Sequence, residues 1–113
     1  MHELSLCNAI REVVGRAAAG RPVDTVHLRV GKFRQVVPET LCYCWELVTA
    51  TSPLAGSTLA IDHVDISLRC AACTAETTPQ GPLALVCTTC GSGDVSILTG
   101  EEFLVTSLEL KES

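Results

Sequence analysis

The sequence predicts an α+β fold in which two helices and three strands are interrupted by a cysteine-rich insertion. Three observations support this prediction. Apolar residues recur at helical spacing in two segments, and they alternate with polar residues in three others. Between the second and third of those strands lie two Cys-x-x-Cys pairs in a stretch that offers little to an apolar core. Hydrophobic residues make up 47% of the 113 residues, an ordinary share for one globular domain.

The first helix is predicted from about Glu3 to Ala19. Its apolar residues recur at steps of three and four, which places them on one face. Gly20 and Pro22 then end the helix, as glycine and proline commonly do just beyond a C-terminus. The predicted stripe consists of Leu4, Cys7, Ile10, Val14, Ala17 and Ala18.

The second helix is predicted to begin at Pro38, because proline suits the first helical turn, and to end before residues 51–53. Cys7 and Cys44 lie on the apolar stripes of their helices and are expected to be core thiols, whereas Cys42 lies off its stripe. The stripe of the second helix consists of Leu41, Cys44, Trp45 and Val48.

The strands are predicted from period-two alternation. One covers residues 26–30, with His27 on its solvent face. The second runs from Leu59 to Leu68, and its alternation changes phase near His63, which predicts a β-bulge there. The third covers residues 104–110.

The insertion has the ligand spacing of a zinc site. Cys70-Ala-Ala-Cys73 and Cys87-Thr-Thr-Cys90 are separated by 13 residues, and each pair can present two thiolates to one tetrahedral ion. Gly91 after the second pair can take the positive φ of a tight turn. Four cysteine ligands leave no open position for water, so the predicted role of the zinc is structural. Iron, redox disulfides or no metal are the alternatives.

Other function classes find less support. Residues 70–98 contain no Lys or Arg and the formal net charge is −5, so nucleic-acid binding would lack phosphate contacts. No nucleophile with an evident histidine base and no Gly-rich phosphate loop is present, so we do not expect an enzyme. No secretory signal or membrane-spanning run is recognisable, and seven cysteines is an odd number for a disulfide framework, which favours a cytoplasmic protein.

Met1-His2-Glu3 is by itself a weak metal-binding signal. The order of motifs along the chain is more specific, since Met1-His2-Glu3 and a helix precede a strand ending in Val30-Gly31 and a helix that begins Pro-Glu-x-Leu. A strand, the two Cys-x-x-Cys pairs and a last strand follow. In this order the chain resembles the HypA/HybF family of nickel-incorporation proteins in [NiFe]-hydrogenase maturation, over essentially its whole length.

The resemblance implies two domains. Residues 1–68 and 99–113 would form a nickel-binding domain of two helices packed on a three-stranded sheet, and residues 69–98 an inserted zinc-ribbon-like domain. Nickel would be bound by the amine of Met1, the imidazole of His2 and the backbone amide nitrogens of His2 and Glu3, and such planar nitrogen ligation suits Ni(II). Glu39 stands where family members can have an acidic residue near the nickel.

The resemblance also implies partners, namely a HypB-type GTPase and the hydrogenase large subunit. The chain itself would be a monomer or a homodimer. Two rival functions remain open: a zinc-ribbon scaffold that binds a protein partner without a nickel role, and a thiol redox sensor that uses the Cys-x-x-Cys pairs. Replacing His2 would distinguish the nickel carrier from the scaffold.

Overall fold

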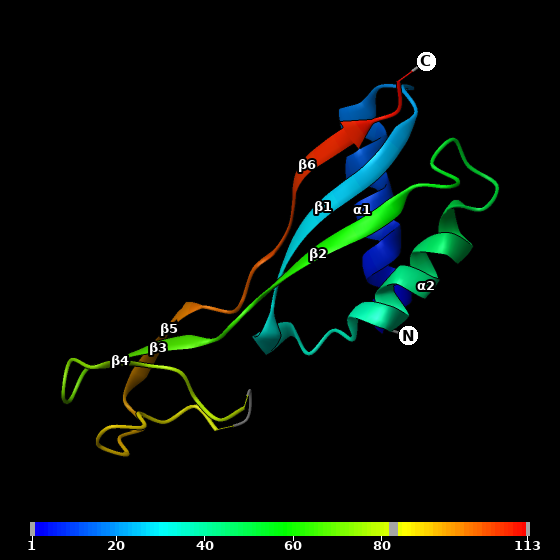
Figure 1. Cartoon of the computed structure of the whole chain (residues 1–113). Helices are drawn as coiled ribbons and strands as arrows, with labels where there is room; N and C mark the ends of the chain where they lie inside the picture. The colour runs from blue at the N-terminus through cyan, green and yellow to red at the C-terminus, as the bar shows by residue number, and fades with distance from the viewer. Residues whose placement is uncertain (1, 82–83, 113) are drawn as a thin grey trace. The chain divides into compact units, whose positions relative to one another are not determined.

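The computed structural model describes residues 2–81 and 84–112 and confirms the α+β class (Figure 1). The chain divides into two compact units. The first comprises Met1–Arg29, Val36–Asp62 and Leu104–Ser113, and the second comprises Val30–Gln35 and His63–Phe103. The helices and strands of the whole chain are, in order, α1 (His2–Ala18), β1 (Val23–Gly31), the short 3-10 helix η1 (Lys32–Arg34), α2 (Pro38–Thr49), β2 (Thr58–Val64), β3 (Ser67–Cys70), β4 (Glu76–Thr77), β5 (Val95–Thr99) and β6 (Phe103–Leu110).

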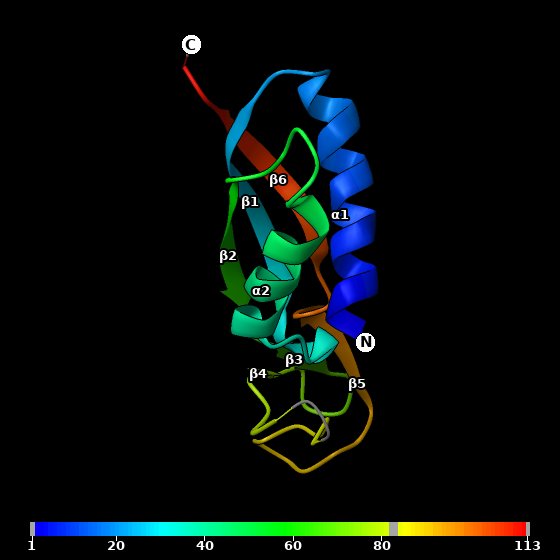
Figure 2. The ribbon, with the colours of Figure 1, turned by 90° about the vertical axis from the view of Figure 1, so that its right-hand side faces the viewer.

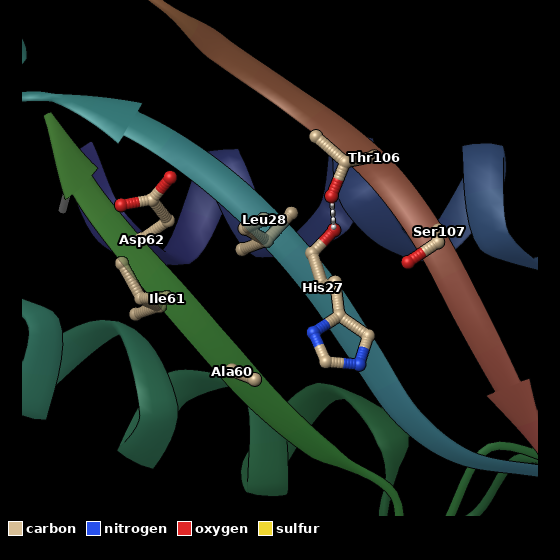
Figure 3. Close-up of a pocket in the computed structure, with 7 residues that line it drawn as sticks. All are labelled: His27, Leu28, Ala60, Ile61, Asp62, Thr106 and Ser107. Atoms are coloured by element: carbon tan, nitrogen blue, oxygen red, sulfur yellow. Dashed lines mark hydrogen bonds between the residues drawn. The ribbon is translucent and has the colours of Figure 1, made fainter.

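The first unit is built on a three-stranded sheet of order β2-β1-β6. The arrows of β1 and β2 point the same way and β6 runs opposite to them (Figure 3). The amide of Lys111 accordingly donates to the carbonyl oxygen of Pro22 across the β1–β6 pair, at 3.0 Å. Both helices lie on one face of this sheet, which leaves the other face open (Figures 2 and 3).

The core of the first unit follows the predicted stripes with local exceptions. Leu4 and Ala17 are exposed because they lie at the margins of the α1 stripe, and Cys44 is only half-buried, so the prediction of a core thiol there was wrong. The indole Nε1–H of Trp45 donates to Ser57 Oγ at 3.0 Å, which satisfies the one polar group of this buried ring. The buried positions of the two helices are Cys7, Ile10, Val14, Ala18, Leu41, Trp45 and Thr49.

The second unit contains another three-stranded sheet, of order β4-β3-β5, in which β3 pairs antiparallel with both neighbours. The predicted single strand from Leu59 to Leu68 was wrong: the chain leaves one sheet after Val64 and enters the other at Ser67. Asp65 occupies this break, where its carbonyl oxygen accepts from Thr99 Oγ1 at 2.8 Å and its carboxylate pairs with Lys32. The change of phase in the sequence therefore marks a change of sheet rather than a bulge near His63.

Two glycines in the second unit permit a close approach of backbones. A Cβ atom on Gly31 would lie 1.9 Å from the carbonyl oxygen of Gly100, so no other residue fits at Gly31 without a shift. Gly100 itself has a φ of 111°, which side chains rarely allow.

The predicted zinc domain, residues 69–98, falls within the second unit, which also takes in residues 30–35, 63–68 and 99–103. The narrower boundary stays a prediction. None of the helices in the described part of the chain has both the length and the apolar character that crossing a bilayer requires.

Candidate metal centre

The four cysteines of the second unit converge on one point. Their Sγ atoms all lie within 4.8 Å of one another. The distance is 3.6 Å between the sulfurs of Cys70 and Cys90, and 3.5 Å between those of Cys73 and Cys87. Tetrahedral zinc with bonds of about 2.3 Å to sulfur requires sulfurs about 3.8 Å apart. The donor set therefore fits a tetrahedral zinc ion.

The two Cys-x-x-Cys segments share one backbone conformation. The amide of Thr74 donates to the carbonyl oxygen of Cys70 at 2.9 Å, and the amide of Gly91 donates to that of Cys87 at 2.8 Å. Each turn closes on a residue of positive φ, 63° at Thr74 and 77° at Gly91, as predicted for Gly91. Matching turns thus aim two pairs of sulfurs at a common centre.

The same turns favour the thiolate form of the first cysteine in each pair. Backbone N–H groups, first that of Cys73, point at the sulfur of Cys70 and lower the pKa of its thiol. Backbone N–H groups led by that of Cys90 lower the pKa of Cys87 to about 6. Since zinc binds thiolates, these N–H groups prepare Cys70 and Cys87 for the metal. The pKa values of the Cys73 and Cys90 thiols are raised, in spite of backbone N–H groups that act the other way, because their sulfurs share hydrogen bonds with those of Cys87 and Cys70.

The chemistry of the centre is that of a closed site. Every donor is sulfur, and Cys70 and Cys87 are buried whereas Cys90 is exposed. Within residues 2–81 and 84–112, no other group of three or more His, Cys, Asp or Glu side chains is placed to hold a metal ion. Zinc bound there would crosslink two turns and leave no position for a substrate.

The proposed nickel ligands fall at the edge of the described chain. Met1 and the side chain of His2 lie outside the described residues. Glu3 is described, and its Oε2 accepts a hydrogen bond from the amide of Val37 at 3.3 Å. Val37 immediately precedes α2, and Glu39 lies in the first turn of that helix. The first turn of α1 is thereby tied to the start of α2, a contact that periodicity alone did not predict.

Comparison with known proteins supplies the family. Residues 1–110 match the family described as "Hydrogenase/urease nickel incorporation, metallochaperone, hypA". The chain belongs to the HypA family. A relative from Desulfosudis oleivorans, the "Hydrogenase maturation factor HypA", is 40% identical over 99% of this chain and all of its own length. The protein of the same name from Streptomyces avermitilis is 36% identical over 99% of this chain and 88% of its own.

A solved structure agrees with the fold. The solution structure of "the Ni metallochaperone HypA from Helicobacter pylori" matches with a TM-score of 0.67 and 23% identity, covering 97% of each chain. As a HypA-family member, the chain is a maturation metallochaperone with a four-cysteine metal centre and not a catalytic enzyme. A role in maturation implies contact with other maturation proteins.

The remaining histidines of this HypA chain lie apart from the cysteine centre. His27 is on the outer face of the first sheet, as predicted, where its Nε2 contacts the carboxylate of Glu109. Its backbone carbonyl accepts from Thr106 Oγ1 at 3.2 Å, beside a hollow of about 360 Å³ that Asp62 also lines (Figure 3). His63 is exposed. The pairing of His27 with Glu109 was not predicted, because no local pattern links residues so far apart in the sequence.

Proposed function

We propose that this HypA-family chain binds Ni(II) at its N-terminus and delivers it during [NiFe]-hydrogenase maturation. The amine of Met1, the imidazole of His2 and the backbone amide nitrogens of His2 and Glu3 would be the ligands. Four nitrogen donors in one plane suit Ni(II), and the neighbouring carboxylate of Glu3 adds negative charge. The nickel is cargo, so the site must also release it.

The contact between Glu3 and Val37 is the observation that supports this proposal. It holds the first turn of α1 beside the start of α2. In this proposal the acidic side chain of Glu39, in the first turn of α2, would belong to the surroundings of the nickel. The part of α1 that follows Glu3 would then anchor the site. Glu39 would act on the bound cation through its charge without ligating it.

The four cysteines complete the proposal as a structural zinc centre formed by Cys70, Cys73, Cys87 and Cys90. A zinc ion there would hold the second unit together, and the nickel would not pass through it. The proposed partners are a HypB-type GTPase that supplies nickel and the hydrogenase large subunit that receives it, in the cytoplasm.

Native mass spectrometry of the untagged protein tests the nickel site directly. With one equivalent of Ni(II), the wild type should carry one zinc and one nickel, and His2→Ala should keep zinc but lose nickel. Lowering the pH from 7.5 to 6 should weaken uptake, because the imidazole must be neutral and amide protons must leave.

His63→Ala is the matched control, since it removes another histidine that is exposed and lies in the second unit. It should bind nickel and zinc as the wild type does. Equal nickel uptake by the wild type and His2→Ala would mean that the terminus is not the site, and the zinc-ribbon scaffold without a nickel role would then be the better interpretation.

A further inference from the structure

A groove of about 480 Å³ lies between α2 and β2 in the first unit. Pro38 and Cys42 line it from the helix, and Leu59 and Ile61 line it from the strand. Both ribbon views show α2 beside β2 (Figures 1 and 2). Apart from Glu39, whose charge was proposed to act on the nickel, the residues that line this groove have no role in the nickel site or the cysteine centre.

Two large side chains of α2 are exposed at or near the groove. Tyr43, which lines it, is 61% exposed, and Leu47, one helical turn later, is 56% exposed. A tyrosine beside an apolar groove is a common anchor of protein interfaces, because its ring offers a large rigid contact area and its hydroxyl can stay hydrated. The side chains favour a protein partner over a small polar ligand.

The charged side chains that line the groove are all acidic. Glu39 and Glu46 both line it, no Lys, Arg or His does, and neither carboxylate forms an ion pair among the described residues. The protein as a whole carries a formal charge of −5. Cations of a partner would therefore be attracted to this surface, and the two carboxylates would fix where they bind.

The strand that forms one wall is also the outer strand of its sheet. In the order β2-β1-β6, no strand of the described chain pairs with the free edge of β2. An extended segment can lie along such an edge and use its backbone groups, while alternate side chains enter a neighbouring groove.

We propose that this groove binds an extended segment of a partner protein in which apolar residues are flanked by Lys or Arg. An apolar side chain of that segment fits between α2 and β2 against Tyr43, and its cations pair with Glu39 and Glu46. This docking surface contains none of the proposed nickel ligands and shares only Glu39 with their proposed surroundings, so the chain would hold a partner by one part of the first unit while its terminus carries the metal.

The probe is the peptide Arg-Leu-Val-Leu-Lys-amide with fluorescein on its N-terminal amine, titrated with the untagged zinc protein and followed by fluorescence anisotropy. Tyr43→Ala should weaken binding about tenfold or more, since an interface anchor is lost. Glu46→Gln should weaken it severalfold and reduce its dependence on salt. Glu12→Gln, which changes an exposed glutamate of α1, should leave the affinity unchanged. The acidic counterpart, Glu-Leu-Val-Leu-Glu-amide with the same N-terminal label, should not bind.

Amide shifts in 15N-resolved spectra should locate the bound peptide on α2 and β2. Absence of binding at millimolar peptide, equal affinity of the wild type and Tyr43→Ala, or shifts confined to other elements would each overturn the proposal. Sedimentation showing that wild-type copies associate through Tyr43 in place of the peptide would overturn it too, since the occupant would be a second copy. His2→Ala should bind the peptide normally, which separates failure of this proposal from failure of the nickel site.

Discussion

The pKa of one cysteine thiol in the first unit, Cys7, and that of one in the second, Cys87, are shifted in opposite directions by their surroundings. The neighbour of Cys87 does not follow it, since the sulfur of Cys87 raises the pKa of the Cys73 thiol to about 12 against the effect of the backbone N–H of Ala75. In the first unit, burial against α2 raises the pKa of the Cys7 thiol to about 12, and its Sγ donates to the carbonyl oxygen of Leu41 at 3.3 Å. In the second unit, backbone N–H groups lower the pKa of Cys87 to about 6. One thiol is kept neutral as a core side chain and the other is prepared as a metal ligand. The same residue type thus serves an apolar core in one unit and a metal centre in the other.

The largest expected effect comes from removing one ligand of the metal centre. Cys73→Ala should abolish stoichiometric zinc binding and unfold the β4-β3-β5 sheet, because structural zinc contributes about 10–16 kcal/mol of apparent binding energy to such sites. The first unit should stay folded. Metal analysis together with 15N-resolved spectra would measure both results at once.

Cys44→Ala is the control for that experiment, since it removes a half-buried thiol of the first unit. It should retain one zinc per chain and an unchanged spectrum of the second unit. Full zinc occupancy in Cys73→Ala would contradict the assignment of the four cysteines as one zinc site.

A smaller effect is expected from a cavity in the core of the first unit. Leu41 is fully buried and its backbone carbonyl receives the hydrogen bond from Cys7. Leu41→Ala should lower the free energy of unfolding of this unit by about 2–5 kcal/mol. Urea denaturation followed by the fluorescence of Trp45, the one tryptophan of the chain, measures this unit.

The zinc content of Leu41→Ala should remain one per chain in the absence of urea, because the cysteines belong to the other unit. The exposed Leu47→Ala serves as the matched control, and its unfolding free energy should change far less. Loss of zinc in folded Leu41→Ala would show that the two units are stabilised together. The first unit could then not be treated as a core that is stable independently of the metal centre.

The elements that were predicted best from the sequence are those whose apolar residues recur with a regular period. Both helices were found to within about two residues of their ends, because burial of one helical face leaves a repeating apolar pattern. The four-cysteine centre was also found, since ligand spacing is local. The fold therefore depends chiefly on signals that short segments carry.

Contacts between distant segments could not be predicted in the same way. The change of sheet after Val64 depends on the contacts of Asp65 with Thr99 and Lys32, which alternation within one strand does not record. The strand β4 has only two residues, Glu76 and Thr77, and is too short to show an alternation. The hydrogen bond from Val37 to Glu3 likewise joins two helices whose relative position periodicity leaves open.

The smallest expected effect concerns the protonation of Cys7. A thiol whose pKa is raised on folding stabilises the folded state below the ordinary value of 9.0, and that contribution is lost as the pH rises from there towards about 12. Between pH 9 and 11, the unfolding free energy of the first unit should therefore fall more steeply with pH in the wild type than in Cys7→Ala. The difference between the two slopes should reach up to about 1.4 kcal/mol per pH unit.

Urea titrations at several pH values, read from Trp45, measure that difference in slope. Other titrating groups are common to both proteins and cancel in the comparison. Val14→Ala truncates another fully buried side chain of α1 that carries no proton, so it should lower stability while keeping the wild-type slope. Parallel curves for the wild type and Cys7→Ala would mean that Cys7 ionises alike in the folded and unfolded chain. The contrast between the raised pKa of Cys7 and the lowered pKa of Cys87 would then be lost.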